Sequence, residues 1–435
     1  MGRGALSRRP VGRTLPQHAP HRRQFTGRPI GSPSSLGVAH PMSTSTETSF
    51  RKALPWTAFV ALLFMLNYTA RSALSPLLVD LERDLAVGHA QATGLLLVQA
   101  AGFSASQFVC GFLLARISPG RMVALSLTLS GLCLLGMSLV ETLGTARLVF
   151  GLFGFMAGLY FPAGMATLSS LVSPRDWGKA VAVHELAPNT SFILLPLFAE
   201  AALRHMDWRG VFSVLGSCLA LLGLAFALFG RGGRTLAAPP SYAGCREALR
   251  TPATWVFIVL FSVCVAGEFA TFSVLPVHLV TELHFTETTA NQLVSLSRLL
   301  CPFAAVAGGW FADRAGAGGI IKGYLLLHGA ALSLMALSEP VWVFIGMSAQ
   351  AFVTAFSFPA LFKAFAQSFP AARQPLLLSL TMPVACLIGT GAAPAFLGLC
   401  GQHASFGAGF MALGGISVLT LLTLRALPHA ALGRG

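Results

Sequence analysis

The sequence predicts an all-α membrane protein with twelve transmembrane helices, arranged as two six-helix bundles that repeat one another. The composition, the apolar runs and an internal repeat each indicate this fold class. Of the 435 residues, 54% are hydrophobic and only 10% are charged, whereas a soluble domain carries roughly 25% charged residues. The composition therefore excludes a soluble protein. The net charge of +14 does not indicate a nucleic-acid partner, because Lys and Arg are concentrated in one set of loops, as membrane topology requires.

From Pro55 onward the chain contains twelve apolar runs, each long enough to cross a lipid bilayer. The runs cover about residues 55–79, 92–115, 122–140, 146–171, 179–203, 210–229, 252–280, 290–312, 319–338, 340–367, 375–400 and 406–427. The loops between them are short, and only the sixth loop is long and basic. All six Trp lie at the ends of runs, where an aromatic belt is expected at the membrane interface.

The last six runs repeat the first six. Pro196 corresponds to Pro394 and Phe212 to Phe410, both 198 positions later. Six helices repeated in the same orientation predict two bundles related by an axis along the membrane normal. The expected domains are a first bundle at 55–229, an inter-bundle loop at 230–251, a second bundle at 252–427 and a short tail at 428–435.

Residues 1–54 form a basic segment rich in Arg, Pro, Ser and Gly. Such a segment buries too little apolar surface to fold, so it is expected to be disordered. Two interpretations of it stay open. It is Arg-rich and poor in acids like an organellar transit peptide, although it lacks an amphipathic face. The interpretation we favour is that translation begins at Met42.

The distribution of Lys and Arg predicts the orientation in the membrane. With the N-terminus inside, and the N-terminal tail left out, the inner segments carry 13 Lys and Arg and the outer segments carry 4. Both termini are therefore expected to be cytoplasmic. We expect a multi-pass protein of the plasma membrane, in bacteria the inner membrane, and a monomer.

Several ionisable residues lie within the predicted spans, namely Arg71, Glu185 with its neighbour His184, Glu268, Arg298 and Lys363. A charge at the centre of a bilayer costs about 2.5–3.5 kcal/mol, so each needs a partner or a function. Lys363 is near a helix end and is expected to extend to the interface, and His184 is expected to be packed and hydrogen bonded. The alternative to a functional role is an interhelical ion pair, for example between Glu268 and Arg298 or Arg71.

One loop motif points to a family. Gly309-Trp310-Phe311-Ala312-Asp313-Arg314-Ala315-Gly316 follows the eighth run and resembles the G-x-x-x-D-R-x-G motif of the major facilitator superfamily. The resemblance covers residues 55–427 and includes Trp208-Arg209-Gly210 at the start of the sixth run. It implies that Gly309, Asp313, Arg314 and Gly316 belong to a gating loop. The first copy of the motif departs from the pattern, because Ala115 stands where the family has an acid.

A second motif suggests the substrate class. Asn67-Tyr68-Thr69-Ala70-Arg71 resembles the Asn-Tyr-x-x-Arg of organic-anion transporters in the superfamily, in which the Arg holds the anion. The three side chains share one helical face. Arg71 and Arg298 lie at similar depth in opposite bundles, so together they can clamp a carboxylate by bidentate bonds. The predicted substrate-binding residues are Asn67, Tyr68, Arg71, Glu185, Asn189 and Arg298.

The sequence thus predicts a secondary transporter that moves a small organic anion by alternating access, with Glu268 carrying a coupled proton. The alternative within the same fold is a multidrug or other efflux transporter, although the fifth run lacks the glycines of drug/proton antiporters. A membrane enzyme or a receptor is a third class, but no catalytic constellation is apparent. The eight Cys are scattered without metal-ligand spacing, so no metal and no cofactor are expected.

Overall fold

The computed structural model describes residues 50–236, 242–370 and 373–427. In this part of the chain every regular element is a helix, and twelve helical segments are long and apolar enough to cross a membrane. The predicted fold class is therefore confirmed. Most of the predicted N-terminal tail and all of the predicted C-terminal tail lie outside the described residues.

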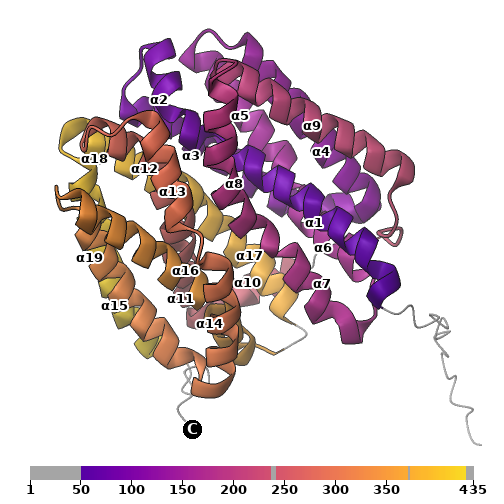
Figure 1. Ribbon diagram of the computed structural model, residues 1–435. Coiled ribbons are helices and arrows are strands. Elements are labelled where there is room, and N and C mark those ends of the chain that lie inside the picture. The colour runs from indigo at the N-terminus through magenta and orange to yellow at the C-terminus, as the bar shows by residue number, and fades with distance from the viewer. Residues whose placement is uncertain (1–49, 237–241, 371–372, 428–435) are drawn as a thin grey trace, which may run out of the picture. The chain divides into compact units, whose positions relative to one another are not determined.

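The spans are built from one to three helical pieces each (Figure 1). The first six are α1 (Phe50–Ser72) with α2 (Leu74–Leu85), α3 (His89–Leu114), α4 (Pro119–Gly136) with η1 (Met137–Leu139), α5 (Leu143–Gly158) with α6 (Tyr160–Ser169), α7 (Trp177–His184) with α8 (Leu186–Leu203), and α9 (Trp208–Phe229). The last six are α11 (Pro252–Val265) with η3 (Ala266–Ala270) and α12 (Thr271–Thr281), α13 (Glu287–Ser297) with α14 (Cys301–Ala315), α15 (Ala317–Met335), α16 (Pro340–Ser368), α17 (Gln374–Cys386) with η5 (Leu387–Ala392) and α18 (Ala393–His403), and α19 (Phe406–Leu419) with η6 (Thr420–Ala426). A short turn, η2 (Pro174–Asp176), precedes α7.

Side-chain caps start four of the helices. The oxygens of Thr142, Asp207, Thr286 and Ser405 each accept a hydrogen bond from a backbone N–H in the first turn of α5, α9, α13 and α19. These caps satisfy donors that a helix start otherwise leaves without partners. Asp207 and Ser405 are 198 residues apart, so the sequence repeat extends to the way in which the last helix of each bundle begins.

Four spans are interrupted at or beside an ionisable residue. The first span breaks just after Arg71, the fifth breaks at Glu185 and the eighth breaks at Arg298. In the seventh span, Glu268 lies inside the π-helical segment η3. π-Helical segments and breaks of this kind are frequent at functional sites. Four of the charges predicted within the membrane are therefore presented at or beside irregular backbone, whereas Lys363 lies within the continuous helix α16.

Glycines set the closest helix contacts within each bundle. A Cβ on Gly154 of α5 would lie 2.0 Å from the carbonyl oxygen of Gln99 on α3. A Cβ on Gly308 of α14 would lie 1.8 Å from the carbonyl oxygen of Phe356 on α16. Small residues let membrane helices approach each other closely. The two contacts join equivalent spans, the second with the fourth and the eighth with the tenth.

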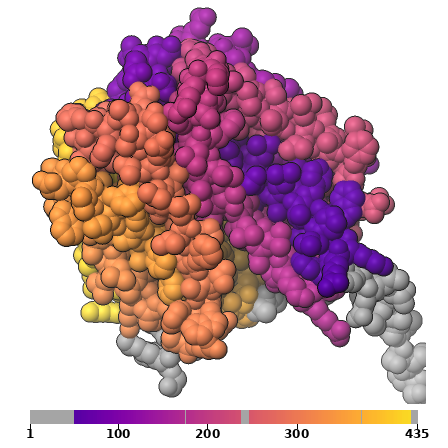
Figure 2. Space-filling model, viewed as in Figure 1, coloured from indigo at the N-terminus to yellow at the C-terminus, as the bar shows by residue number. Residues whose placement is uncertain are grey.

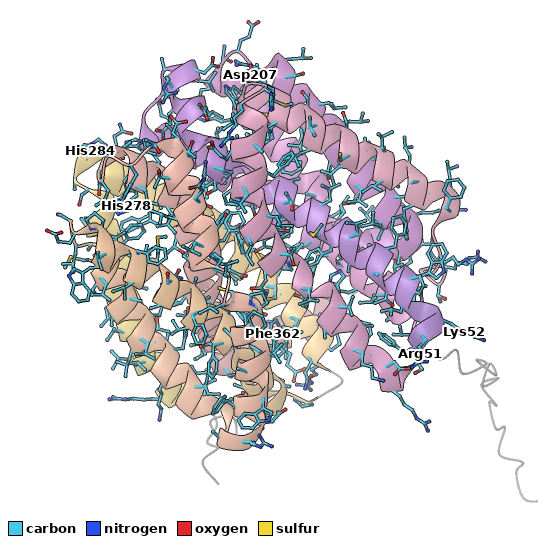
Figure 3. All side chains as sticks on the ribbon, in the orientation of Figure 1. Arg51, Lys52, Asp207, His278, His284 and Phe362 are labelled. Carbon is cyan, nitrogen blue, oxygen red and sulfur yellow. The ribbon has the colours of Figure 1, made fainter. Side chains whose placement is uncertain are left out.

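The two bundles are joined at one end of the spans, which carries Asp207 and His284 and which we call the joined end (Figure 3). Within the described residues, four hydrogen bonds cross between the bundles in that half. They run from Arg83 to Glu287 at 2.6 Å, from Thr288 to Glu200 at 2.7 Å, from Ser75 to the Phe272 carbonyl at 2.7 Å, and from the Ala90 N–H to Gln402 at 3.0 Å.

Toward the opposite end, which carries Arg51 and Lys52 (Figure 3), the bundles separate. Among the described residues, the hydrogen bond between the bundles that lies nearest to this end runs from Ser104 to the Pro383 carbonyl. The space-filling view shows the surface hollowed between α7 and α14 on this side (Figure 2). The hydrogen bonds between the bundles are therefore concentrated toward the joined end, and the surface between the bundles is hollowed toward the other end.

The segment predicted as an inter-bundle loop contains a helix, α10 (Tyr242–Arg250). Arg373, which precedes α17, forms an ion pair of 2.8 Å with Glu247 of this helix. The Thr254 hydroxyl and the Trp255 indole N–H of α11 donate to carbonyl oxygens near the end of α10. The connection between the bundles at 230–251 thus includes a short helix, which the polar composition of the segment did not indicate.

Candidate functional site

The structure brings four predicted site residues together from both bundles. Tyr68 and Arg71 come from α1, Glu268 from η3, and Arg298 from the break between α13 and α14. Tyr68 and Glu268 each interact electrostatically with both arginines. We call these four residues the charged cluster. Sequence spacing places each of them in the membrane but does not show that they meet, because about 200 residues separate the two pairs.

Arg71 is buried at 6% exposure, and aromatic rings surround its guanidinium. The guanidinium carbon lies 3.8 Å from the ring centre of Phe103 on α3 and 5.4 Å from that of Tyr68. Its Nε atom is buried without a hydrogen-bond partner in the described part of the chain. A cation over an aromatic face gains about 0.5–2 kcal/mol, which is less than the several kcal/mol that burial of an ion costs.

Arg298 has a similar environment in the other bundle. It is 3% exposed, and its Nη2 donates to the backbone carbonyl of Glu268 at 3.0 Å. The guanidinium carbon lies 4.6 Å from the ring centre of Phe192 and 5.2 Å from that of Phe272. Its Nε also has no partner among the described residues. Within those residues, neither arginine forms an ion pair with a carboxylate.

Glu268 is half-buried in the π-helical segment of the seventh span. Its carboxylate interacts electrostatically with Arg298, Glu185 and Arg71 but forms no ion pair with the described residues. The interhelical ion pair that the sequence left open is therefore not formed, since Arg298 bonds to the backbone oxygen of Glu268 and not to its carboxylate. The carboxylate can consequently gain or lose a proton without breaking a direct ion pair.

The remaining candidates lie at the margin of the cluster or have packing contacts. Glu185 is 46% exposed, and its carboxylate forms a 3.1 Å hydrogen bond with His184, which is fully buried and stacked on Phe64 at 4.2 Å. Asn189 is half-buried and forms no side-chain hydrogen bond within the described residues. The Asn67 amide donates to the Ala157 carbonyl of α5 at 3.4 Å. Asn67 therefore connects the first and fourth spans, and its predicted contact with substrate stays a prediction.

The gating-loop motif lies at the end of α14. Gly316 has φ +81°, a conformation that favours glycine, and it is the single residue between α14 and α15. Gly309 makes no close backbone approach, since a Cβ there would meet only Pro359 at 3.8 Å. The close approach to α16 is made by the neighbouring Gly308, which is not a residue of the motif.

The two charged residues of the motif have different partners. The carboxylate of Asp313 forms a 3.0 Å ion pair with Lys363 of α16, which also donates to the Ala312 carbonyl at 2.9 Å. Arg314 lies over the ring of Trp310 at 3.7 Å. Lys363 was expected only to extend toward the interface, and its spacing from the motif, 50 residues, carries no signal of this pairing. The motif is thus tied to the tenth span.

The arrangement offers no site for a metal among the described residues, since no cluster of metal-ligating side chains is found there. Seven of the eight cysteines are described, and all seven are free. What the site offers is two buried cations from opposite bundles, a carboxylate and a phenol. Such a site can bind an anion and can move a proton, but it contains no nucleophile paired with a base.

Twelve spans in two repeated bundles, with ionisable residues gathered between them, define a membrane transport protein. The chain belongs to the Major Facilitator Superfamily, whose model matches residues 60–327 and 265–434. Its family and relatives are transporters, so the chain is a multi-pass membrane transporter for a small molecule and not an enzyme.

Two relatives match in sequence. The "Probable L-galactonate transporter" of Escherichia coli (strain K12) is 25% identical over 198 residues, which cover 45% of this chain and 43% of that protein. The match therefore spans less than half of that transporter. The MFS-type transporter YceJ of Bacillus subtilis (strain 168) is 25% identical over 375 residues, which cover 83% of this chain and 94% of that protein.

Among solved structures, the chain resembles a bacterial homologue of the human lysosomal transporter Spinster, in its inward-facing and unoccupied conformation. The TM-score is 0.69 at 14% sequence identity, with coverage of 89% of this chain and 98% of that one. At this identity the likeness shows the fold alone.

Proposed function

We propose that this transporter moves a small organic anion, carboxylate-like in its chemistry, by alternating access and together with a proton. The observation that carries the proposal is the pair of buried guanidiniums, Arg71 and Arg298, which come from opposite bundles and have no carboxylate partner among the described residues. A bound anion between the bundles would compensate both charges. It would also contact both moving halves of the protein, as alternating access requires.

The geometry of the two arginines favours a carboxylate. Each has a Nε atom without a partner, and a guanidinium that offers Nε and one Nη presents two parallel donors to the two oxygens of a carboxylate. The rings of Phe103 and Phe192 lie 3.8 Å and 4.6 Å from the guanidinium carbons of Arg71 and Arg298, so each guanidinium is packed against an aromatic ring. The name of one relative, an L-galactonate transporter, refers to a sugar acid, and this chemistry agrees with the proposed substrate class.

Glu268 is the proposed proton carrier. It is the carboxylate that interacts electrostatically with both arginines and with Tyr68. Burial favours the protonated form of a carboxyl and neighbouring cations favour the ionised form, so arrival of the anion between the arginines changes the balance at Glu268. Anion binding and proton binding are thereby linked in one site.

The proposal includes an orientation. The excess of Lys and Arg in the predicted inner segments supports a cytoplasmic location for both termini. The joined end then faces outward, and the structure corresponds to an inward-open state. We propose a monomer in the plasma membrane, in a bacterium the inner membrane.

Arg71→Lys and Arg71→Gln test the anion site. Loss of a bidentate bond to a charged group costs about 1.5–3 kcal/mol, which corresponds to about a 10- to 100-fold loss. We therefore expect both variants to lower carboxylate uptake by at least tenfold at equal membrane abundance, although Lys keeps the charge.

Arg209→Lys is the matched control. Arg209 pairs with Asp84 at 2.7 Å and with the Val140 carbonyl, away from the cluster, so its variant should retain uptake. Uptake near the wild-type rate in Arg71→Lys would contradict the clamp. A thermal-shift screen of the purified protein with small carboxylates and with cationic drugs identifies the ligand class independently, because a ligand stabilises the folded state that binds it.

A further inference from the structure

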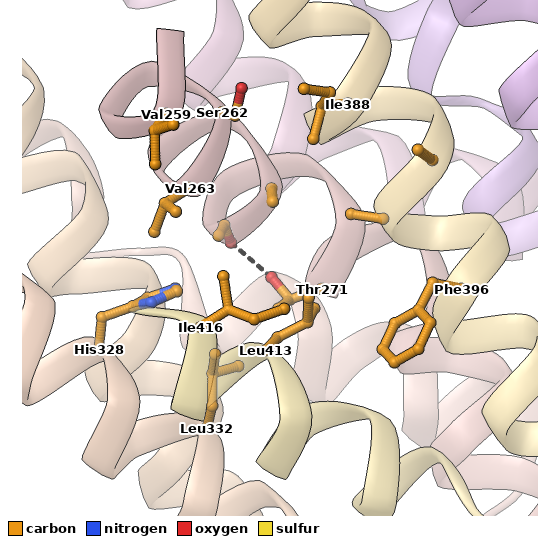
Figure 4. A pocket seen from close by; sticks show the side chains of 14 residues that line it. Val259, Ser262, Val263, Thr271, His328, Leu332, Ile388, Phe396, Leu413 and Ile416 are labelled. Carbon is orange, nitrogen blue, oxygen red and sulfur yellow. Dashed lines mark hydrogen bonds between the residues drawn. The ribbon is translucent and has the colours of Figure 1, made fainter. Parts of the chain in front are cut away.

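A cavity lies within the C-terminal bundle, apart from the charged cluster (Figure 4). It has a volume of about 350 Å³ and is lined by residues of the seventh, ninth, eleventh and twelfth spans. None of the four residues of the charged cluster lines it. Ala266 and Gly267, which do line it, immediately precede Glu268 in η3. The cavity is thus next to the segment that carries Glu268.

The polar side chains in the lining already have partners. The Ser262 hydroxyl donates to the Ile258 carbonyl at 2.6 Å. The Thr271 hydroxyl lies 2.6 Å from the Gly267 carbonyl and 3.2 Å from the Gln350 amide oxygen. A water molecule or a polar ligand needs two or more free polar groups to replace the bonds it makes in water. These two side chains do not supply them.

His328 is the remaining polar side chain of the lining, and both of its ring nitrogens are occupied. Nδ1 lies 3.1 Å from the Ser417 hydroxyl, which is also 3.1 Å from the Leu325 carbonyl, and Nε2 lies 3.3 Å from the Gln350 amide nitrogen. The Gln350 amide nitrogen can only donate, and the Ser417 hydroxyl can donate to the Leu325 carbonyl, so these bonds fit a neutral His328 ring with its proton on Nδ1. The cavity therefore does not suit the anion proposed for the charged cluster.

The rim of the cavity faces the medium within the membrane. Val259, Ile388, Phe396 and Ile416 line it and are 37–49% exposed. All four belong to membrane-spanning segments, so the medium at the rim is lipid hydrocarbon. An apolar cavity that stays empty forfeits dispersion contacts along its walls, and a hydrocarbon chain restores them without losing any hydrogen bond.

We infer that this cavity is a binding site for one acyl chain of a membrane phospholipid. An engineered apolar cavity of about 150 Å³ accommodates a benzene molecule, so the 350 Å³ here suffice for a longer stretch of hydrocarbon. The chain enters between the eleventh and twelfth spans and lies against Ala266 and Gly267. The acyl chain thereby packs against η3, the segment that carries Glu268.

Photolabelling tests the site. The full-length protein is reconstituted into vesicles that contain a phospholipid with a diazirine on one acyl chain, and the insertion sites are mapped by peptide mass spectrometry. The inner wall at Ser262, Val263 and Ala266 is no more than 9% exposed. If an acyl chain occupies the cavity, this buried wall should be labelled at least as strongly as Leu326 and Leu327, which are 52% and 58% exposed elsewhere on the bundle.

A variant that fills the cavity provides the control. Ala392 lines it and is exposed, so Ala392→Phe should lower labelling of the inner wall at least fivefold. Ala330→Phe, at an exposed position of α15 outside the cavity, should leave it unchanged. Ile416→Trp fills the cavity from another helix and serves if Ala392→Phe does not fold.

Three outcomes would overturn the assignment. Labelling confined to exposed residues would mean ordinary contact with bulk lipid. Equal labelling of the inner wall in wild type and in both filled variants would mean that the chain does not occupy the cavity. Labelling of the wall by a diazirine fatty acid but not by the phospholipid would assign the cavity to a free amphiphile. These results do not depend on transport, so they stand apart from the test of the anion site.

Discussion

At the scale of single residues, the chemistry of the charged cluster depends on which group carries the proton. Glu268 has no direct ion pair within the described residues, and its backbone oxygen, not its carboxylate, binds Arg298. A permanently paired carboxylate would lose its partner with every protonation. The contact through the backbone instead keeps Arg298 in place whichever protonation state Glu268 adopts.

Glu268→Gln fixes the neutral form of this side chain. If Glu268 carries the coupled proton, pH-driven accumulation of substrate should fall to the level of passive equilibration. Exchange of labelled for unlabelled substrate needs no net proton movement, so it should persist, as should binding. Both are measured side by side in reconstituted vesicles.

The structural alternative predicts a different pattern. If Glu268 instead stabilises the fold through its electrostatic interaction with Arg298 and Arg71, the variant would lose stability, binding and exchange together. Loss of all three, or accumulation that survives, would exclude Glu268 as the carrier. Glu247→Gln is the control, because Glu247 is 61% exposed in α10 and should leave both measurements unchanged.

At the scale of elements, the sequence predicted the spans but not their interruptions. Hydrophobic runs mark which residues are in the membrane, and a run reads the same whether its helix is continuous or broken. The breaks at Glu185 and Arg298 lie three and four residues before Pro188 and Pro302, and a proline disrupts the helix turn that precedes it. These two breaks therefore have a signal within their own runs. The π-helical segment around Glu268 instead has a contact with a distant span, because Gln350 of α16 donates to the Gly267 carbonyl, and the seventh run alone does not contain this information.

Contacts between elements also connect the ends of spans. Glu282 follows α12, and its carboxylate accepts the Phe406 N–H at the start of α19 at 2.6 Å and bonds to His278 at 3.0 Å. Burial raises the pKa of Glu282, but the hydrogen bonds from His278 and from the backbone at Phe406 outweigh it and hold the pKa below its usual value. The ionised form is therefore the one that stabilises the fold.

Glu282→Gln should lower the melting temperature at pH 7. A depressed pKa contributes stability that is present above the unfolded value, about 4.3, and that is lost as the pH falls through the folded value. The difference in melting temperature between wild type and variant should therefore shrink as the pH falls below about 4.3. A capping bond of this kind contributes about 1 kcal/mol. Melting is followed in detergent between pH 7 and pH 3.

Glu339→Gln is the matched control for this measurement. Glu339 is exposed, and its side chain forms no capping bond to α16, which it precedes. The Glu339→Gln variant should have the same melting temperature as the wild type at every pH. A difference for Glu282→Gln that stays constant down to pH 3 would mean that ionisation of this carboxyl does not stabilise the fold.

At the scale of the whole molecule, the repeat allowed the architecture to be predicted, whereas the site could be predicted only in part. Arg71, Arg298 and Glu268 stand out because a charge in an apolar run is costly. The phenylalanines that surround the arginines do not, because Phe103, Phe192 and Phe272 are three among 33. The ion pair between Asp313 and Lys363 could not be predicted from the sequence either, because only the folded chain brings the eighth and tenth spans together.

The orientation of the molecule provides the last prediction. Ala315 at the end of α14 and Glu141 before α5 are both exposed and lie at opposite ends of the spans. In a background without native cysteines, Ala315→Cys should resist a membrane-impermeant thiol reagent in intact cells and react once the membrane is opened. Glu141→Cys should react in intact cells. The physical reason is the excess of Lys and Arg in the segments on the Ala315 side, which are retained in the cytoplasm during insertion. Rapid labelling at Ala315→Cys with protection at Glu141→Cys would reverse the orientation, and the state in the structure would then be open to the outside.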